Sequence, residues 1–307
     1  MAAATPNWIP RFAQHDKTPK MKLCRFRHAD ARPRVGLLTA NSRDVIDLTR
    51  ASVERIDELL EEPKFLARLA KLTADPTLPR LPLPAITLLP PVDEQEVWAV
   101  GVTYLRSKAA RMEESDFSAT AYDRVYAAPR PELFFKSPPQ KVVGTGDTVG
   151  IRRDAKWNVP EPELVLVFNS RGTLVGFTIG NDMSSRDIEG ENLLYLPQAK
   201  IYDRACALGP WIVVGETEKA ARTWTIKIRI TRAGREVFGG ATKIDRIKRP
   251  FAQLRNYLFR SQTFPRGAML LTGTGVVPDD TFTLRRGDEI AITVPAIGTL
   301  VNTVVIV

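Results

Sequence analysis

Two glutamates separated by a single residue, Glu161 and Glu163, have the types and spacing that most clearly suggest chemistry. Side chains at positions i and i+2 of a β-strand project from the same face, so both carboxylates are expected to point the same way, beside an apolar run. Like charges at that range cannot both stay ionised cheaply, so one takes a proton or a cation lies between them. The alternative is a solvated strand start, where Glu161 and Glu163 merely flank Pro162.

A third carboxylate follows on the next expected strand. That strand covers residues 174–180, across a turn at 169–172, and leads into Asp182. If the two strands pair, Asp182 approaches the glutamates and completes a set of three oxygen ligands. Such hard ligands suit Mg²⁺, with Mn²⁺ or Ca²⁺ as alternatives. Both histidines, His15 and His28, lie near the N-terminus, which argues against a histidine-rich metal site.

Other segments could bind an anion. Lys200 stands between apolar neighbours, where it could pair with a substrate carboxylate or carry a proton, although an exposed loop lysine is more common. Gly273 and Thr274 lie at an expected strand end, where amides and hydroxyls can approach an anion closely. The chain has no dinucleotide fingerprint, no P-loop and no G-x-S-x-G motif. Dinucleotide binding, phosphoryl transfer and serine-esterase chemistry are therefore not expected.

The elements that position these residues are predicted from hydrophobic periodicity and turn residues. Residues 1–20 are expected to form a flexible arm, 21–90 a small N-terminal α/β domain and 91–307 the catalytic domain, with the proline-rich stretch 76–91 as an extended connector. A helix is expected over 52–72, with Ser52 as its N-cap. Further helices are expected at 104–114 and 249–260. Strands are expected at 22–26, 34–38, 45–48, 97–102, 133–136, 164–168, 174–179, 211–214, 224–231, 268–272, 289–294 and 300–307. The pattern predicts a β-rich α+β fold.

Composition excludes several classes of protein. The 307 residues include 44 Lys+Arg against 35 Asp+Glu, a net charge of +9, and 44% hydrophobic residues. The basic residues are scattered in short runs, so no nucleic-acid surface is expected. No stretch approaches the roughly 18 apolar residues of a membrane span. Two distant cysteines, Cys24 and Cys206, give no disulfide framework, so with no targeting segment a cytoplasmic location is expected.

Six short segments, taken in chain order, resemble the fumarylacetoacetate hydrolase family. They are Gly101-Val102-Thr103-Tyr104, Leu133-Phe134-Phe135-Lys136, Glu161-Pro162-Glu163-Leu164, the run from Gly180 to Asp187, Leu208-Gly209-Pro210 and Thr272-Gly273-Thr274. The resemblance implies a β-sandwich-roll fold, a divalent metal on Glu161, Glu163 and Asp182, small anionic 2-oxo acid substrates, and a homodimer or homotetramer. Within these segments Lys136 and Arg186, together with Lys200, Gly273 and Thr274, are expected to contact the substrate.

One departure from the family pattern favours a particular chemistry. Hydrolytic members activate water with a histidine, and the matching position here is Ser107, with no histidine after His28. Elimination is therefore favoured over carbon–carbon hydrolysis. Residues 122–136, 157–164 and 191–202 most closely resemble the 2-keto-3-deoxy-D-arabinonate dehydratase subgroup. This likeness implies dehydration of a 2-keto-3-deoxy-pentonate, of the D-arabinonate or D-xylonate type, to 2,5-dioxopentanoate in oxidative pentose catabolism.

The resemblance also suggests a mechanism, which we state as a hypothesis. Mg²⁺ would chelate the C1 carboxylate and the C2 carbonyl and stabilise the enolate formed when a C3 proton leaves. Glu114, with Glu113 beside it, lies where the family has a mobile lid and is the expected base. Glu189 and Lys200 are candidates for proton transfer. Two alternatives stay open: a family hydrolase or decarboxylase acting on an acylpyruvate or other 2-oxo acid, and a non-catalytic sugar-acid binder.

Overall fold

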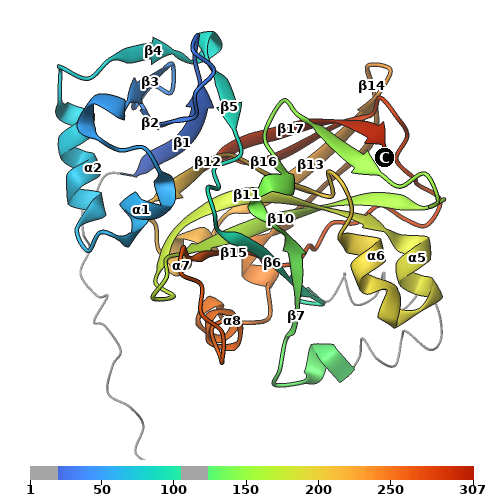
Figure 1. Ribbon diagram of the computed structural model, residues 1–307. Helices are drawn as coiled ribbons and strands as arrows, with labels where there is room; N and C mark the ends of the chain where they lie inside the picture. Colours follow the sequence, from blue (N-terminus) through green and yellow to red (C-terminus); the bar gives the residue numbers. More distant parts are fainter. Residues whose placement is uncertain (1–19, 105–123) are drawn as a thin grey trace, which may run out of the picture.

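Two β-sheets form the framework of the computed structural model, which describes residues 20–104 and 124–307 (Figure 1). The larger sheet has twelve strands, ten of them in the order β4-β3-β2-β1-β12-β11-β10-β15-β6-β7, with β5 beside β1 and β8 beside β12. The smaller sheet has the order β14-β13-β16-β17-β9. Helices are short and lie around these sheets, so the predicted β-rich α+β class is confirmed.

The strands of the larger sheet are β1 (Met21–Arg27), β2 (Arg34–Leu38), β3 (Asp44–Asp47), β4 (Arg80–Pro82), β5 (Thr87–Leu89), β6 (Glu96–Gly101), β7 (Glu132–Ser137), β8 (Val142–Val143), β10 (Asn158–Phe168), β11 (Leu174–Ser185), β12 (Cys206–Val214) and β15 (Ala268–Leu271). Those of the smaller sheet are β9 (Thr148–Ile151), β13 (Thr225–Arg232), β14 (Arg235–Lys243), β16 (Glu289–Val294) and β17 (Gly298–Ile306). The labelled helices are α1 (Ile56–Glu61), α2 (Phe65–Ala74), α5 (Arg186–Glu191), α6 (Leu196–Lys200), α7 (Glu218–Ala221) and α8 (Phe251–Leu258).

Strand β10 lies between two hydrophobic cores because successive side chains of a strand alternate between its faces. Leu164 and Leu166 join the core that also contains the buried residues of the smaller sheet. Val165 and Val167 join the other core, with residues of β1, β2, α1 and α2. Glu161 precedes Val165 by an even number of residues, so it shares the face of the second core. This alternation explains the uninterrupted apolar run in the sequence.

The same strand contains two prolines, which central strands normally exclude. The carbonyl of Leu164 accepts a hydrogen bond from the amide of Thr272, so even-numbered residues of β10 direct their backbone groups toward β15. The pairing with β15 runs only from Val165 to Phe168. Pro160 and Pro162 therefore lie where, in the described part of the chain, no neighbouring strand needs an amide donor. This arrangement lets β10 begin at Asn158, ahead of the predicted start.

The N-terminal elements extend the larger sheet. Strand β1 pairs with β12 in antiparallel register, Leu23 opposite Ile212, and α1 and α2 group with β1–β4 at one side of the molecule (Figure 1). The arm at 1–20 lies, apart from its last residue, outside the described residues, and the predicted boundary at residue 90 stays a prediction. Among the described residues, no helix has the length and apolarity needed to cross a membrane.

The helix expected over 52–72 forms as two, α1 and α2, and Ser52 does not cap either. Pro63 lies between them, and proline cannot continue an i→i−4 ladder. Ser52 has a φ of 56° and ends a 3-10 turn. Instead, the amides of Ile56 and Asp57 donate to a carboxylate oxygen of Asp93. A residue distant in sequence thus satisfies the start of α1, which no local spacing could reveal.

Candidate metal centre and active site

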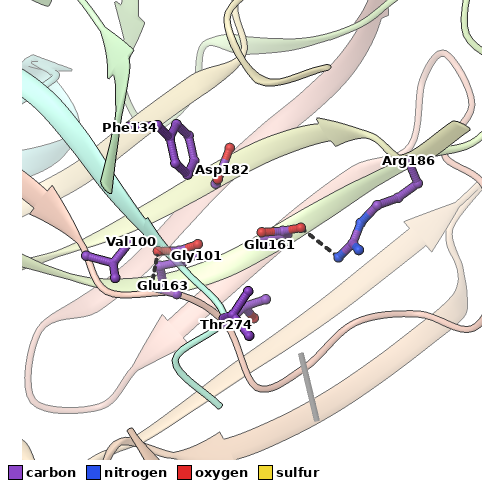
Figure 2. A pocket seen from close by; sticks show the side chains of 10 residues that line it. Val100, Gly101, Phe134, Glu161, Glu163, Asp182, Arg186 and Thr274 are labelled. Atoms are coloured by element: carbon purple, nitrogen blue, oxygen red, sulfur yellow. Dashed lines mark hydrogen bonds and ion pairs between the residues drawn. The ribbon is translucent and has the colours of Figure 1, made fainter. Parts of the chain in front are cut away.

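Three carboxylates meet where β10 and β11 pair. In the antiparallel register Glu161 lies opposite Asp182, and Glu163 lies opposite Gly180. Each acid offers an oxygen, and these three oxygens lie within 4.8 Å of one another. Glu161 is 3% exposed and Glu163 is 1% exposed, so the expected pairing is confirmed and the solvated alternative is wrong. Figure 2 shows the three side chains converging, with Phe134 beside Asp182.

Buried cations surround this acidic triad, by which we mean Glu161, Glu163 and Asp182. Lys200 Nζ lies 3.0 Å from Glu161 Oε2 and 3.2 Å from Asp182 Oδ2. Arg186 Nη2 lies 2.7 Å from Glu161 Oε1 (Figure 2). Both cations are at most 1% exposed. Taking charges out of water is costly unless they are paired, so these contacts offset the desolvation of the acids.

Lys136 supports the centre from behind Asp182. Its Nζ forms an ion pair with Asp182 Oδ1 and donates to the backbone carbonyls of Met183, at 3.1 Å, and of Lys200. Lys136 is 1% exposed as a whole residue. Lys136 therefore ties β7, β11 and the end of α6 together around one carboxylate. Its predicted contact with substrate stays a prediction.

Burial and neighbouring charges act strongly on the carboxyl group of Glu163. Burial, followed by the charges of Asp182 and Glu161, raises the pKa of Glu163 well above its ordinary value. The amide of Gly273 opposes this by donating to Glu163 Oε2 at 2.5 Å. The sequence predicted that close carboxylates would either keep a proton or bind a cation. The buried carboxylates of the triad meet the conditions for that prediction.

The loop that supplies this amide requires glycine. Gly273 has a φ of +86°, and a Cβ there would lie 2.2 Å from Thr103 Oγ1. Thr103 in turn donates to the carbonyl of Thr272 at 2.6 Å, which fixes the loop against the end of β6. Thr274 Oγ1 accepts from the amide of Val276. The Gly273 amide thus serves Glu163, while the predicted substrate contacts of Gly273 and Thr274 stay predictions.

The triad opens into a pocket. It is lined by Val100, Gly101, Val102, Phe134, Glu161, Glu163, Asp182, Arg186, Gly273 and Thr274. The apolar residues that line the pocket were not predicted as site residues, because Val100 and Phe134 look like ordinary strand residues in the sequence. One signal appears only in the structure: Val102 adopts a φ of 53°, which β-branched residues rarely do.

Within the described residues, the structure does not place the predicted catalytic glutamates among the acids of the triad. Glu113, Glu114 and Ser107 lie outside the described residues. Glu189 is buried on α5, and its Oε2 lies 4.0 Å from Arg186 Nε, three residues earlier. Arg186 therefore lies between Glu189 and Glu161. Proton transfer by Glu189 stays a prediction.

The donor set fits a hard divalent cation. Three carboxylate oxygens converge in a buried site, which is the kind of ligand that Mg²⁺ prefers. No histidine or cysteine joins this ligand group within the described residues. Both cysteines are buried free thiols, and Cys206 lies opposite Asp182 in the β11–β12 pair. A β-sheet scaffold that holds three acids around a hard-cation site defines the class of this protein as a candidate metal-dependent enzyme.

Comparison with known proteins places the chain more narrowly. The family model described as fumarylacetoacetate (FAA) hydrolase C-terminal matches residues 96–305, so this chain belongs to the fumarylacetoacetate hydrolase family. A probable 2-keto-3-deoxyxylonate dehydratase of Haloferax volcanii is 48% identical over 214 residues, covering 70% of this chain and 73% of that protein. A 2-dehydro-3-deoxy-D-arabinonate dehydratase of Saccharolobus solfataricus is 40% identical over 222 residues, covering 71% and 74%.

A solved structure shares most of the fold. It is that of a 2-keto-3-deoxy-D-arabinonate dehydratase complexed with magnesium and 2,5-dioxopentanoate, with a TM-score of 0.79 and 33% identity, covering 94% of this chain and 99% of that chain. The predicted fold and family membership are thereby confirmed.

Proposed function

We propose that this chain is a magnesium-dependent hydro-lyase that removes one water from a 2-keto-3-deoxy-pentonate and forms 2,5-dioxopentanoate. The observation that carries the proposal is the buried triad of Glu161, Glu163 and Asp182, in a chain whose 48% and 40% identical relatives are named as dehydratases of such acids. The lack of any histidine after His28 supports elimination over histidine-assisted hydrolysis.

The triad would hold the ion, and its neighbours would keep the triad in place. When bound, magnesium supplies Lewis-acid stabilisation of the negative charge that develops on a 2-oxo acid, and it orients that acid. Arg186 holds Glu161 from one side, and Lys136 holds Asp182 from behind. The Gly273 amide holds Glu163. Because these partners come from β7, α5 and the loop after β15, the acids are fixed before any ligand arrives.

Loss of water across C3 and C4 gives a 5-hydroxy-2-oxo-3-enoate. A proton shift from C5 to C3 and tautomerisation of the resulting enol then yield the C5 aldehyde of 2,5-dioxopentanoate. The elimination itself requires two proton transfers by the chain. A base must take the C3 proton, and an acid must assist departure of the C4 hydroxyl. Glu114, with Glu113 beside it, is our candidate base. Lys200 is our candidate for holding the substrate carboxylate or relaying a proton, because its ammonium touches two acids of the triad. Glu189 is a second candidate relay, separated from Glu161 by Arg186.

The substrate class is inferred from the charges around the pocket. Arg186 lines the pocket, and Lys136 and Lys200 lie close behind its acids. With a divalent cation on the triad, this cluster carries an excess of positive charge that favours a small anion. We further propose a homodimer or homotetramer in the cytoplasm, which light scattering and cell fractionation would test.

A substrate screen tests the function. The metal-stripped protein is supplied with Mg²⁺ and each stereoisomer of a 2-keto-3-deoxy-pentonate, and the products are analysed by an aldehyde assay and mass spectrometry. We expect loss of one water with formation of an aldehyde. Cleavage of an acylpyruvate, or carbon dioxide from oxaloacetate, would favour the hydrolase or decarboxylase alternative. Ligand-induced thermal stabilisation without any product would favour the binder.

A further inference from the structure

We propose that Ser184 is a positioning residue that holds the ammonium of Lys200 beside the acidic triad. The inference rests on the proposed function, since it concerns a residue of that site. Ser184 and Lys200 are both 0% exposed. Lys200 Nζ donates to Ser184 Oγ at 2.5 Å, and Ser184 Oγ lies 3.2 Å from the carbonyl of Asp182, to which it donates. The hydroxyl therefore connects the lysine to the backbone of β11.

The surroundings of the ammonium explain why a neutral partner matters. Two of the oxygens within reach of Lys200 Nζ, Glu161 Oε2 and Asp182 Oδ2, belong to the expected metal ligands. A bound cation draws on the same carboxylate charge and so weakens their hold on the ammonium. Ser184 Oγ is uncharged and lies outside the triad. Its hydrogen bond with Lys200 does not compete with the metal, so it can hold the ammonium in the loaded site.

The other end of Lys200 is fixed independently. Lys200 is the last residue of α6, and its carbonyl accepts a hydrogen bond from Lys136 Nζ. A lysine side chain has several rotatable bonds, so fixing the backbone leaves the ammonium free to adopt many positions. Ser184 removes that freedom at the tip. The backbone of Lys200 and its charge are thus held by two different residues, Lys136 and Ser184.

The adjacent serine provides a matched control. Ser185 is also 0% exposed, and its Oγ donates to Asn158 Oδ1 at 2.8 Å. Successive side chains of β11 project from opposite faces, so Ser185 lies away from Lys200. Ser184→Ala and Ser185→Ala delete the same buried hydroxyl, with its hydrogen bond, from neighbouring positions. A merely structural effect would appear in both variants.

Turnover and metal affinity are measured for these variants with Mg²⁺ and the substrate found for the wild type. We expect Ser184→Ala to lower kcat about tenfold or more, the usual effect of losing a hydrogen bond to a charged group, and Ser184→Thr to restore most of it. The Mg²⁺ dissociation constant, from calorimetry on metal-stripped protein, should not rise, because Ser184 Oγ lies outside the triad and its hydrogen bond does not compete with the metal. In a Lys200→Met background, Ser184→Ala should have no further effect on kcat. Equal losses in Ser184→Ala and Ser185→Ala, or a parallel loss of Mg²⁺ affinity, would overturn the proposal.

A spectroscopic measurement separates this proposal from the proposed function. In protein with ¹⁵N-labelled lysine and saturating Mg²⁺, a held ammonium exchanges slowly and gives a distinct NMR signal, assigned by its absence in Lys200→Met. We expect Ser184→Ala to remove the Lys200 signal and to keep that of Lys136. If the wild type dehydrates no pentonate, the proposed function fails while this measurement still tests Ser184. Should Ser184→Ala not fold, Ser184→Cys takes its place, because a thiol is a weak acceptor. An unchanged Lys200 signal would refute the role.

Discussion

Glu161 faces Asp182 directly across the β10–β11 pair, and Lys200 contacts both acids. This relationship makes the acids part of a rigid sheet. Residues paired in a ladder cannot separate without breaking backbone hydrogen bonds, so the spacing of the acids is fixed by the fold. A substitution of one of these acids should therefore change metal binding without being compensated by movement of the others.

Replacing a triad acid with its amide should abolish metal-dependent activity. Glu161→Gln keeps the side-chain volume but removes a charged ligand, so we expect Mg²⁺ affinity and turnover each to fall by more than the roughly 100-fold typical of residues that only support metal ligands. Calorimetry with Mg²⁺ and turnover after EDTA treatment measure this. Glu289→Gln, on the exposed side of β16, is the control. Full turnover in excess chelator would contradict the prediction.

The proposed base should affect catalysis and leave metal binding intact. Glu114→Gln removes the basic carboxylate and leaves the triad unchanged, so we expect kcat to fall by about 100-fold to 10,000-fold, the range for general acid–base groups. Mg²⁺ affinity should be unchanged. Glu113→Gln is the matched comparison, being the same substitution at the next position. Wild-type turnover in Glu114→Gln would move the base elsewhere, and a larger loss in Glu113→Gln would assign it to Glu113.

The glycine loop allows a comparison of two similar glycines. Gly273 and Gly287 have φ values of +86° and +87°, but only at Gly273 would a Cβ meet a neighbour, Thr103 Oγ1 at 2.2 Å. Alanine at either position costs about 1 kcal/mol or more in this backbone region. Gly273→Ala must also move the loop, so we expect a larger loss of unfolding free energy together with weaker Mg²⁺ binding as the amide leaves Glu163. Denaturant titration and calorimetry test this, and equal effects in the two variants would count against it.

Alkaline pH should destabilise the fold through its two thiols. Burial raises the pKa of Cys24 and of Cys206 to about 12, whereas a thiol in an unfolded chain has a pKa of about 8.5. The folded state therefore binds the proton more tightly. This contribution is fully present below about pH 8.5 and is lost progressively as pH rises toward about 12, by up to roughly 1.4 kcal/mol per pH unit for each thiol.

Denaturant unfolding at about pH 8 and about pH 10 measures this loss. The variant with Cys24→Ala and Cys206→Ala should lose less unfolding free energy between the two pH values than the wild type. Lysine deprotonation affects both proteins alike, so the difference isolates the thiols. An identical pH dependence in the two proteins would refute the prediction.

Sequence periodicity located much of the fold but misplaced several element boundaries. Strands 34–38 and 289–294 form as predicted, because alternation and turn residues are local signals. Strand β14 was not predicted, since its exposed, glycine-containing sequence has little alternation. Helices α5 and α6, which carry Arg186 and Lys200, were also missed because each is only five or six residues long. Short helices depend on tertiary packing more than on propensity.

The sequence by itself determined the chemistry of the metal centre: two acids in the i and i+2 positions of one strand, a third acid contributed by the next strand, and no histidine close to them in the sequence. Those facts follow from residue identity and the two-residue period of a strand, which are local. The tertiary structure alone decided that Lys136, Arg186 and Lys200 surround the acids, and that Gly273 supplies an amide to Glu163. These partners come from elements far apart in the chain, and their positions are fixed by sheet pairing and core packing, which no short stretch of sequence encodes.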